Sequence, residues 1–194
     1  MKASGRRAET RLRLFSAAVE LIAEQGYTAT TVDAIAERAG VAKGTVFYNF
    51  GSKEALFTGL LDHGIGLLSG ALSGAAAGRT ALDALDSVVM AQLRFFEEYG
   101  AFARVLLAEM WRTAWQDAVA GLRRDALGVY AGVLRRAVAE GVVRDDLDVE
   151  TAAAAVFGMV LTVAIERKVL HPDRPIERVH ATLVELLHGR VAAG

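Results

Sequence analysis

Apolar residues recur at helical spacing along nearly the whole chain, and short polar or glycine-containing breaks separate the runs. The first run starts near residue 10 and ends at Gly26. Thr30 or Thr31 is placed to cap a second short helix that ends at Gly40, and a third helix covers 43–49. The pattern therefore predicts three short helices in the first fifty residues.

After Ser52, which is placed to cap a fourth helix, the pattern changes to long helices with brief breaks and no strand alternation. We expect these helices near 52–76, 80–98, 101–113, 115–140, 148–169 and 174–191. The prediction is an all-α fold of about nine helices. It places an N-terminal three-helix domain at 1–51 and a larger helical domain at 52–194.

Composition agrees with a globular helical protein, since 53% of the 194 residues are hydrophobic and the only prolines are Pro172 and Pro175. Two uncharged runs, 64–78 and 151–165, fall short of the roughly 20 apolar residues that a spanning helix needs. The charged N-terminus lacks the apolar stretch of a signal peptide, and there is no cysteine. We expect a cytoplasmic protein without membrane association, thiolate metal site or cofactor.

The net charge of −1 argues against a nucleic-acid partner, but basic residues are concentrated at one end. Before Leu14, a single acid, Glu9, is outnumbered by Lys2, Arg6, Arg7, Arg11 and Arg13. A basic arm on a neutral or acidic body is typical of a DNA-binding end attached to a domain with another task. A disordered, solvated tail is the alternative.

The segment TTVDAIAERAGVAKGTVFYNF has the spacing of a helix-turn-helix. Ala36 is small where the two helices touch, Gly40 tolerates a left-handed backbone in the turn, and Val46 locks the second helix. The second helix would then enter the major groove of DNA with its N-terminal residues nearest the base edges. On this spacing alone, two ordinary packed helices with a glycine between them remain an alternative.

The flanking sequence favours the DNA-binding interpretation, because the block from Arg11 to Phe57 closely resembles the DNA-binding domain of the tetracycline-repressor (TetR) family. The matching stretch includes AxxLIAEQGYxxTTVxxIAxxAGVAKGTVFYNFGSKEALF. The resemblance implies that Thr31 and Lys53 contact phosphates at two helix N-termini. It also places five residues on or near DNA: Lys43, Gly44, Thr45, Phe47 and Tyr48.

Two positions depart from the family pattern. Phe47 stands where tyrosine is common, which removes one hydroxyl from the phosphate contacts, and Asn49 stands where histidine or tyrosine is frequent. Tyr48 keeps its hydroxyl and is our preferred phosphate contact, with a partly buried structural tyrosine as the alternative. The operator sequence does not carry over from the family.

Beyond Phe57 the resemblance is limited to architecture, so the dimer interface is argued from the residues. One side of the helix near 148–169 is lined by small or adaptable residues that allow close approach: Ala155, Gly158, Met159 and Thr162. The last helix carries apolar residues at helical spacing, among them Val179, Leu183 and Leu187. Two such helices from each of two chains would form a four-helix homodimer interface, as in the family. Packing within one chain is the alternative.

Aromatic residues and methionines are concentrated in the middle helices, which in this family enclose an inducer cavity. The residues expected around it are Leu67, Met90, Phe95, Phe96, Phe102, Met110, Trp111, Trp115, Tyr130 and Phe157. Such a lining suits a small apolar or aromatic effector. Four polar residues are candidates to orient it: His63, Gln92, Arg94 and Glu109. Each residue taken singly is more often core than lining.

Glycines recur at every fourth residue in the second half of the fourth helix, at positions 66, 70, 74 and 78. Each glycine inside a helix costs roughly 0.5–1 kcal/mol relative to alanine. The pattern predicts a weak or closely packed segment that serves as a compliant link between the DNA-binding and ligand-binding parts. A helix that ends near Leu72 is the alternative.

These observations together predict a ligand-responsive regulator, a repressor in the usual family mode, that binds a palindromic double-stranded DNA operator as a homodimer. An activator or a ligand-independent DNA-binding regulator is the closest alternative. A small helical enzyme and a scaffold that uses the helix-turn-helix only for packing are rival classes. The enzyme is disfavoured because the sequence lacks a G-x-S-x-G or H-E-x-x-H motif and a cysteine nucleophile.

Overall fold

The computed structural model describes residues 2–78, 80–109, 112 and 115–191, and every regular element in that part of the chain is a helix. The helices are α1 (Lys2–Ala29), α2 (Val32–Arg38), α3 (Lys43–Phe50), α4 (Lys53–Ala75), α5 (Ala81–Glu98), α6 (Gly100–Glu109), α7 (Gln116–Leu122), the π-helical segment η2 (Arg123–Leu127), α8 (Gly128–Ala139), α9 (Val149–Leu170) and α10 (Ile176–Val191). The segments α7, η2 and α8 follow one another without a break and form the single helix expected near 115–140. The all-α prediction is confirmed.

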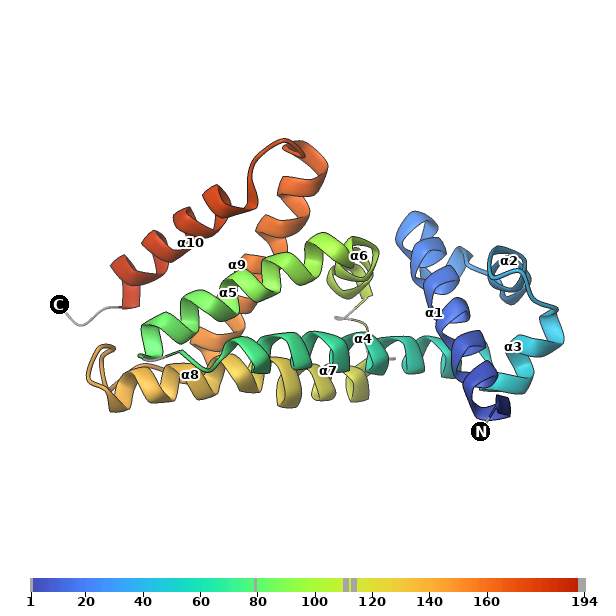
Figure 1. The fold of residues 1–194 in the computed structure, drawn as a ribbon, viewed down its shortest axis with the longest axis horizontal. Coiled ribbons are helices and arrows are strands. Elements are labelled where there is room, and N and C mark those ends of the chain that lie inside the picture. The colour runs from blue at the N-terminus through green and yellow to red at the C-terminus, as the bar shows by residue number, and fades with distance from the viewer. Residues whose placement is uncertain (1, 79, 110–111, 113–114, 192–194) are drawn as a thin grey trace.

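Helices α1 to α3 form a small unit at one end of the molecule, and α4 runs from it into the larger helical body (Figure 1). In that body α5 lies centrally, because it packs against α4 on one side and against α8, α9 and α10 on others. One continuous hydrophobic core extends from Leu14 in α1 to Leu187 in α10. The two parts predicted from the sequence therefore share an apolar interior across α4.

Helix α1 is longer than predicted, because it begins at Lys2 and not near residue 10. Arg6, Arg7 and Glu9 are good helix formers, and no proline interrupts the segment. The basic arm is therefore helical in this structure, and the disordered-tail alternative is wrong. The predicted stop at Gly26 is correct, since this glycine has a φ of 81° that lies outside the helical region.

Helix α4 is continuous to Ala75, so the alternative of an end near Leu72 is wrong. The side chain of Ser52 caps it by accepting a hydrogen bond from the backbone N–H of Ala55 at 3.0 Å. At Gly66, Gly70 and Gly74 an added Cβ would meet nothing within 4 Å, so these glycines face open space and not a tightly packed neighbour.

A buried polar network ties three helices together at the centre of the body. The hydroxyl of Tyr130, which is fully buried, donates to Oε1 of Gln92 at 2.6 Å. Nε2 of Gln92 in turn donates to the backbone oxygen of Phe157 at 2.9 Å. Burial raises the pKa of Tyr130 well above its usual range, which keeps the hydroxyl protonated and able to donate.

Two helices, α4 and α9, are long and apolar enough to cross a membrane by length and composition alone. Both pack inside the helical body: α4 lies against α5, and α9 lies against α5 and α8. Their apolar residues, such as Leu68 in α4 and Val160 in α9, are buried in the shared core. Burial in this core accounts for part of the apolar composition of both helices, since 44% of the apolar window in α4 and 33% of that in α9 are buried.

Candidate DNA-binding surface and ligand groove

The α2–turn–α3 unit has the helix-turn-helix geometry that the sequence predicts. Thr31 caps α2, and its hydroxyl oxygen accepts from the backbone N–H of Ala34 at 3.1 Å. Gly40 has a φ of 63° in the turn, a backbone conformation that residues other than glycine rarely adopt. The N–H of Val41 closes the turn on the carbonyl of Ala36 at 2.9 Å, and Val46 is buried beneath α3.

The outer face of α3 is open to solvent. Tyr48 is 76% exposed and Phe47 is 45% exposed, and Lys43 and Gly44 are exposed at the N-terminal end of the helix. Thr45 is half-buried. Solvent-exposed aromatic side chains on a short helix are unusual unless the surface binds something. The predicted recognition residues therefore lie together on one face, and a buried structural role for Tyr48 is wrong.

Asn49 lies on the opposite, buried face of α3. Its Nδ2 donates to the backbone oxygen of Thr45 at 2.8 Å, whereas its buried Oδ1 has no hydrogen-bond partner. The backbone oxygen of Asn49 accepts from the guanidinium of Arg11 at 3.0 Å, and this guanidinium lies 4.3 Å from the ring centroid of Phe50. Arg11 and Asn49 thus hold α3 against α1.

Arg13 is also occupied within the chain. Its guanidinium donates to the backbone oxygens of Ala39 and Gly40 in the turn, at 2.5 Å and 3.3 Å. Arg6 and Arg7 are exposed, and the guanidinium of Arg7 lies 5.5 Å from the ring centroid of Tyr48. In the basic segment, Arg11 and Arg13 therefore brace the helix-turn-helix, whereas Arg6 and Arg7 are exposed and Arg7 lies beside its outer face.

Lys53 has two intramolecular partners that sequence reasoning did not predict. Its ammonium donates to the backbone oxygens of Tyr27 at 2.9 Å and Thr30 at 2.8 Å, and it lies 4.2 Å from the ring centroid of Tyr27. These bonds bring it beside Thr31 at the start of α2. Lys53 thus fastens α4 to the end of α1, and contact with phosphate would use the remaining N–H of its ammonium.

Lys43 pairs with Asp33 at 2.8 Å, and both side chains are more than half exposed. An exposed pair of this kind contributes only about 0–1 kcal/mol. A DNA phosphate therefore competes for Lys43 at little cost. Asp33 is an acidic group near the expected DNA surface.

Removing residues 1–10 is expected to make DNA binding less dependent on salt, because Arg6 and Arg7 are exposed and Arg7 lies beside Tyr48. If both contact phosphate, the slope of log affinity against log salt concentration falls by about 2. Fluorescence anisotropy at several salt concentrations measures the slope, and Arg144→Ala, remote on the loop after α8, is the control. An unchanged slope in the truncated protein would show that the arm does not reach DNA.

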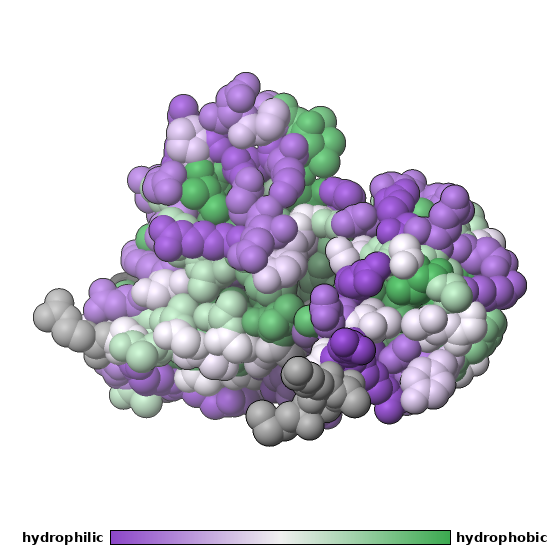
Figure 2. Space-filling model, turned by 45° about the vertical axis from the view of Figure 1, so that its right-hand side comes forward, coloured by the Kyte–Doolittle hydropathy of each residue, from purple (hydrophilic) through white to green (hydrophobic). Residues whose placement is uncertain are grey.

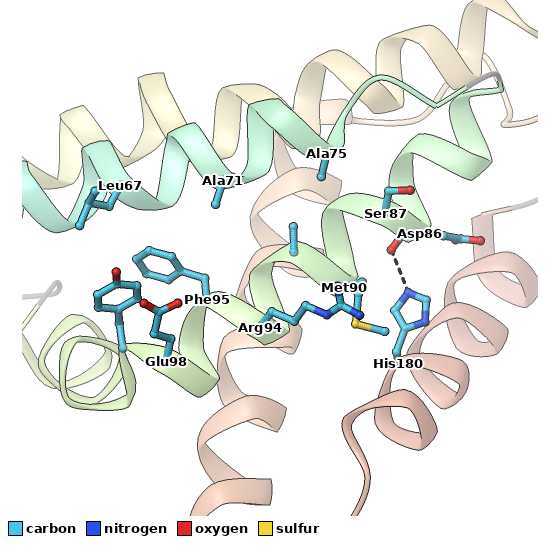
Figure 3. A pocket seen from close by; sticks show the side chains of 12 residues that line it. Leu67, Ala71, Ala75, Asp86, Ser87, Met90, Arg94, Phe95, Glu98 and His180 are labelled. Carbon is cyan, nitrogen blue, oxygen red and sulfur yellow. Dashed lines mark hydrogen bonds between the residues drawn. The ribbon is translucent and has the colours of Figure 1, made fainter.

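A groove of about 730 Å³ lies between α4, α5 and the start of α10, and we call it the α4–α5 groove (Figure 3). It is lined by Leu67, Ala71, Ala75, Asp86, Ser87, Met90, Ala91, Arg94, Phe95, Glu98, Tyr99 and His180. Of the predicted effector-binding residues, Leu67, Met90 and Phe95 lie here, as does the predicted polar residue Arg94.

A second hollow of about 190 Å³, the interdomain pocket, adjoins this groove between α1, α4 and α6. It is lined by Leu12, Phe15, Ser16, Val19, Leu60, His63, Gly64, Leu67, Phe95, Tyr99 and Phe102. The predicted residues Phe102 and His63 belong to it, and the ring of His63 is stacked on Phe15 with centroids 5.3 Å apart. Sequence reasoning did not predict the contribution of α1.

Other predicted effector-binding residues lie in the core. Phe96 and Phe157 pack edge to face with centroids 6.4 Å apart, and Tyr130 is held by Gln92. Trp115 is buried between Tyr27 and Phe57, with centroids 4.9 Å and 4.5 Å away, so it joins the DNA-binding unit to α4. These four line neither the α4–α5 groove nor the interdomain pocket. Met110 and Trp111 lie outside the described residues.

Two of the predicted polar candidates also have structural partners. Gln92 is fully buried in the network with Tyr130. Glu109 is buried, and its carboxylate accepts from the backbone N–H of Tyr27 at 3.4 Å and pairs with Arg112 at 3.1 Å. Neither side chain is available to orient a ligand in the groove.

The predicted dimer-interface residues divide into two groups. On α9, Ala155 and Thr162 are exposed, and Gly158 and Met159 are half-buried. On α10 the three predicted residues are buried in the chain's own core, where α10 packs on α5: Val179, Leu183 and Leu187. All three therefore contribute to packing within the chain, and Val179 and Leu183 also border a hollow next to α9, so the dimer interface on α10 stays a prediction. A groove of about 490 Å³ separates α9 from α10, and the exposed Leu186 lines it.

Comparison with known proteins agrees with this architecture. The family model described as "Bacterial regulatory proteins, tetR family" matches residues 14–60, and one described as "Tetracyclin repressor-like, C-terminal domain" matches residues 78–165. The probable HTH-type transcriptional regulator ArpR of Pseudomonas putida is 31% identical over 175 residues, which cover 85% of this chain and 82% of ArpR.

The uncharacterized HTH-type transcriptional regulator YerO of Bacillus subtilis is 25% identical over 185 residues, and the match spans 92% of this chain but only 63% of YerO. Among solved structures, the transcriptional regulator FadR of Bacillus subtilis in complex with stearoyl-CoA superposes with a TM-score of 0.81 at 23% identity. That match covers 93% of this chain and 98% of FadR. The chain is therefore a DNA-binding transcriptional regulator of the TetR family.

Proposed function

We propose that this regulator is a cytoplasmic repressor that binds a palindromic operator as a homodimer and leaves it when a small apolar effector binds. The open face of α3 carries the DNA-binding part of the proposal, because Tyr48 and Phe47 are exposed with Lys43 beside them. The α4–α5 groove carries the effector part. Helix α4 lines the groove and is fastened to the helix-turn-helix unit through Lys53.

A small molecule that binds between α4 and α5 can act on DNA only if it favours one arrangement of the DNA-binding units over another. Helix α4 is the connecting element, since Leu67 lines the groove and Ser52 caps the end next to α3. A shift of α4 would carry the α3 helices of the two chains out of register with consecutive major grooves. The stearoyl-CoA bound to the FadR structure supports an apolar ligand for this fold.

The homodimer is supported by the groove between α9 and α10, which presents Met159 and Leu186 to a second chain. We expect a stable dimer without DNA at micromolar protein concentration, because one short α3 helix reaches too few bases for specific binding. Sedimentation analysis measures the mass. Leu186→Glu introduces a charge into this groove and is expected to shift the protein toward monomer.

The matched control for the dimer experiment is Leu107→Glu, because Leu107 is an exposed leucine of similar accessibility on α6 (39% against 37%). It should leave the mass unchanged. A wild-type protein that sediments only as monomer would contradict the dimer.

The function is tested by a gel shift with DNA that flanks the protein's own gene. We expect the wild-type protein to retard this DNA, and Lys43→Ala with Tyr48→Ala to lower its affinity about tenfold or more, because both side chains lie on the open face of α3. Arg144→Ala is the control, since Arg144 is paired with Asp146 away from α3. Equal retardation by the wild type and the double variant would contradict the assigned DNA surface.

A further inference from the structure

We propose that the α4–α5 groove and the interdomain pocket form one continuous site for an unbranched aliphatic carboxylate of long chain. Arg94 binds the carboxylate, and the end of the chain lies against Phe15 of α1. The proposal rests on the proposed function and names the ligand class of the same regulator. It adds that the ligand touches the DNA-binding unit directly.

The two hollows adjoin each other, because they share three lining residues: Leu67, Phe95 and Tyr99. Along α4 the combined lining extends from Leu60 to Ala75, which is about 22 Å of helix. The site is therefore long in one direction and bounded on its sides by α4 and α5. An extended chain fits this shape better than a compact ring system.

The size of the side chains that α4 contributes to the groove also favours an aliphatic chain. On α4 the groove is lined on successive turns by Leu67, Ala71 and Ala75, which project little into it (Figure 3). At the other end, Leu12, Leu67 and Tyr99 are 51%, 42% and 37% exposed, although they are large and apolar. Apolar surface also shows in the recess between the α9–α10 lobe and the DNA-binding unit (Figure 2). Clustered exposed apolar side chains of this kind mark a binding surface.

Charge within the groove favours an anionic group at one position. Asp86 is held by Nε2 of His188 at 3.0 Å, and Glu98 accepts a hydrogen bond from Tyr99, which raises the pKa of that tyrosine. Arg94 has no ion pair within the part of the chain that the structure describes. Its side chain runs along the groove toward Met90 and away from Glu98 (Figure 3). A carboxylate ligand would supply the bidentate partner that a guanidinium favours.

The far end of the site leads to the recognition helix through one ring contact. Phe15 lines the interdomain pocket, and its ring centroid lies 5.3 Å from that of Phe50 at the end of α3. Gly59 of α4 lies next to both rings, since an added Cβ there would be 3.4 Å from the ring of Phe15 and 3.7 Å from that of Phe50. Phe15 therefore packs between the ligand site and Gly59 of α4, and a ligand chain pressed against it would move α1 relative to α4. Chains that stop short of Phe15 bind without this effect.

Calorimetric titration of the full-length protein tests the two ends of the ligand separately. For the head group the probes are decanoate and decanol. Arg94→Gln should lower the affinity for decanoate about tenfold and leave the affinity for decanol unchanged. For the chain the probes are octanoate and palmitate. Leu67→Trp narrows the junction of the two hollows. It should lower the affinity for palmitate about tenfold and leave the affinity for octanoate unchanged. Leu107→Trp, on the exposed face of α6, is the matched control and should alter neither ligand.

The coupling is tested on an operator selected from a pool of random duplexes. Palmitate should release the wild-type protein at concentrations where bound octanoate does not. Equal release by both acids would overturn the contact with Phe15, and Arg94→Gln weakening decanol as much as decanoate would overturn the carboxylate site. Two outcomes would overturn the ligand class. One is that palmitoyl-CoA binds more tightly than palmitate and that Arg94→Gln does not change its affinity. The other is that naphthoate and palmitate bind with equal affinity. Failure to select any operator without ligand would instead contradict the proposed function.

Discussion

Replacing Gln92 by leucine is expected to lower the free energy of unfolding by about 2–4 kcal/mol. Gln92 accepts from the hydroxyl of Tyr130 and donates to the backbone oxygen of Phe157, and its side chain is fully inaccessible to solvent. Leucine fills a similar volume but leaves the Tyr130 hydroxyl buried without a partner, which costs the full desolvation of that group. Urea denaturation followed by circular dichroism measures the loss.

The control for this prediction is the double variant Gln92→Leu with Tyr130→Phe. Because it removes both the acceptor and the donor, it should be more stable than the sum of the two single changes implies. If the changes in unfolding free energy of the two single variants add up to that of the double variant, the 2.6 Å contact between Tyr130 and Gln92 contributes nothing as a hydrogen bond. The loss of stability would then reflect packing alone.

Gly64→Ala is expected to destabilise the protein by about 1–3 kcal/mol, although alanine is the better helix former. A Cβ at Gly64 would lie 2.3 Å from Cε2 of Phe102, whose ring is buried against α4. Either this ring or the packing of α6 on α4 must shift. Because Gly64 and Phe102 both line the interdomain pocket, the shift would also change that pocket. Thermal and urea denaturation report the stability.

Gly70→Ala is the matched control on the same helix, since an added Cβ there meets nothing within 4 Å. It should stabilise the protein by about 0.5–1 kcal/mol. The opposite signs of the two substitutions distinguish a steric effect from helix propensity. Loss of stability in both variants would mean that α4 is not an ordinary helix at Gly70.

The helix-turn-helix was predictable from local sequence because its requirements are local. A cap at Thr31, a left-handed residue at Gly40 and a buried apolar residue at Val46 act within a few residues of one another. Helix boundaries followed from similar signals, such as the Ser52 cap at the start of α4. The start of α1 has no such signal, because the helix begins with charged helix formers and its apolar periodicity starts only near residue 10.

The groove could not be derived in the same way, because apolar residues of a helix look alike in sequence whether they face a cavity or a neighbouring helix. Phe96 and Phe157 were expected to line the cavity but pack on each other. Ala71 and Ala75 do line it, and as alanines in a long apolar helix they carried no signal. The lining depends on how α4, α5 and α10 meet, and that is decided by tertiary packing.

The contacts of charged residues are equally hard to predict from sequence. Lys53 looks like a phosphate ligand in sequence, yet its position at the start of α4 brings it onto the carbonyls of Tyr27 and Thr30. Apolar spacing on α10 is equally ambiguous, because Leu183 belongs to the core and also borders the groove next to α9. Periodicity defines which residues share a helix face, but not which neighbour covers that face.

The central claim, that this chain reads DNA sequence through α3, is tested most directly by one comparison of affinities. The measurement is the dissociation constant of the purified protein for its selected operator and for a scrambled duplex of the same length and composition, in the same salt. We predict that the operator binds at least about a thousandfold more tightly, with two chains on each palindrome. Equal affinity for the two duplexes would contradict it.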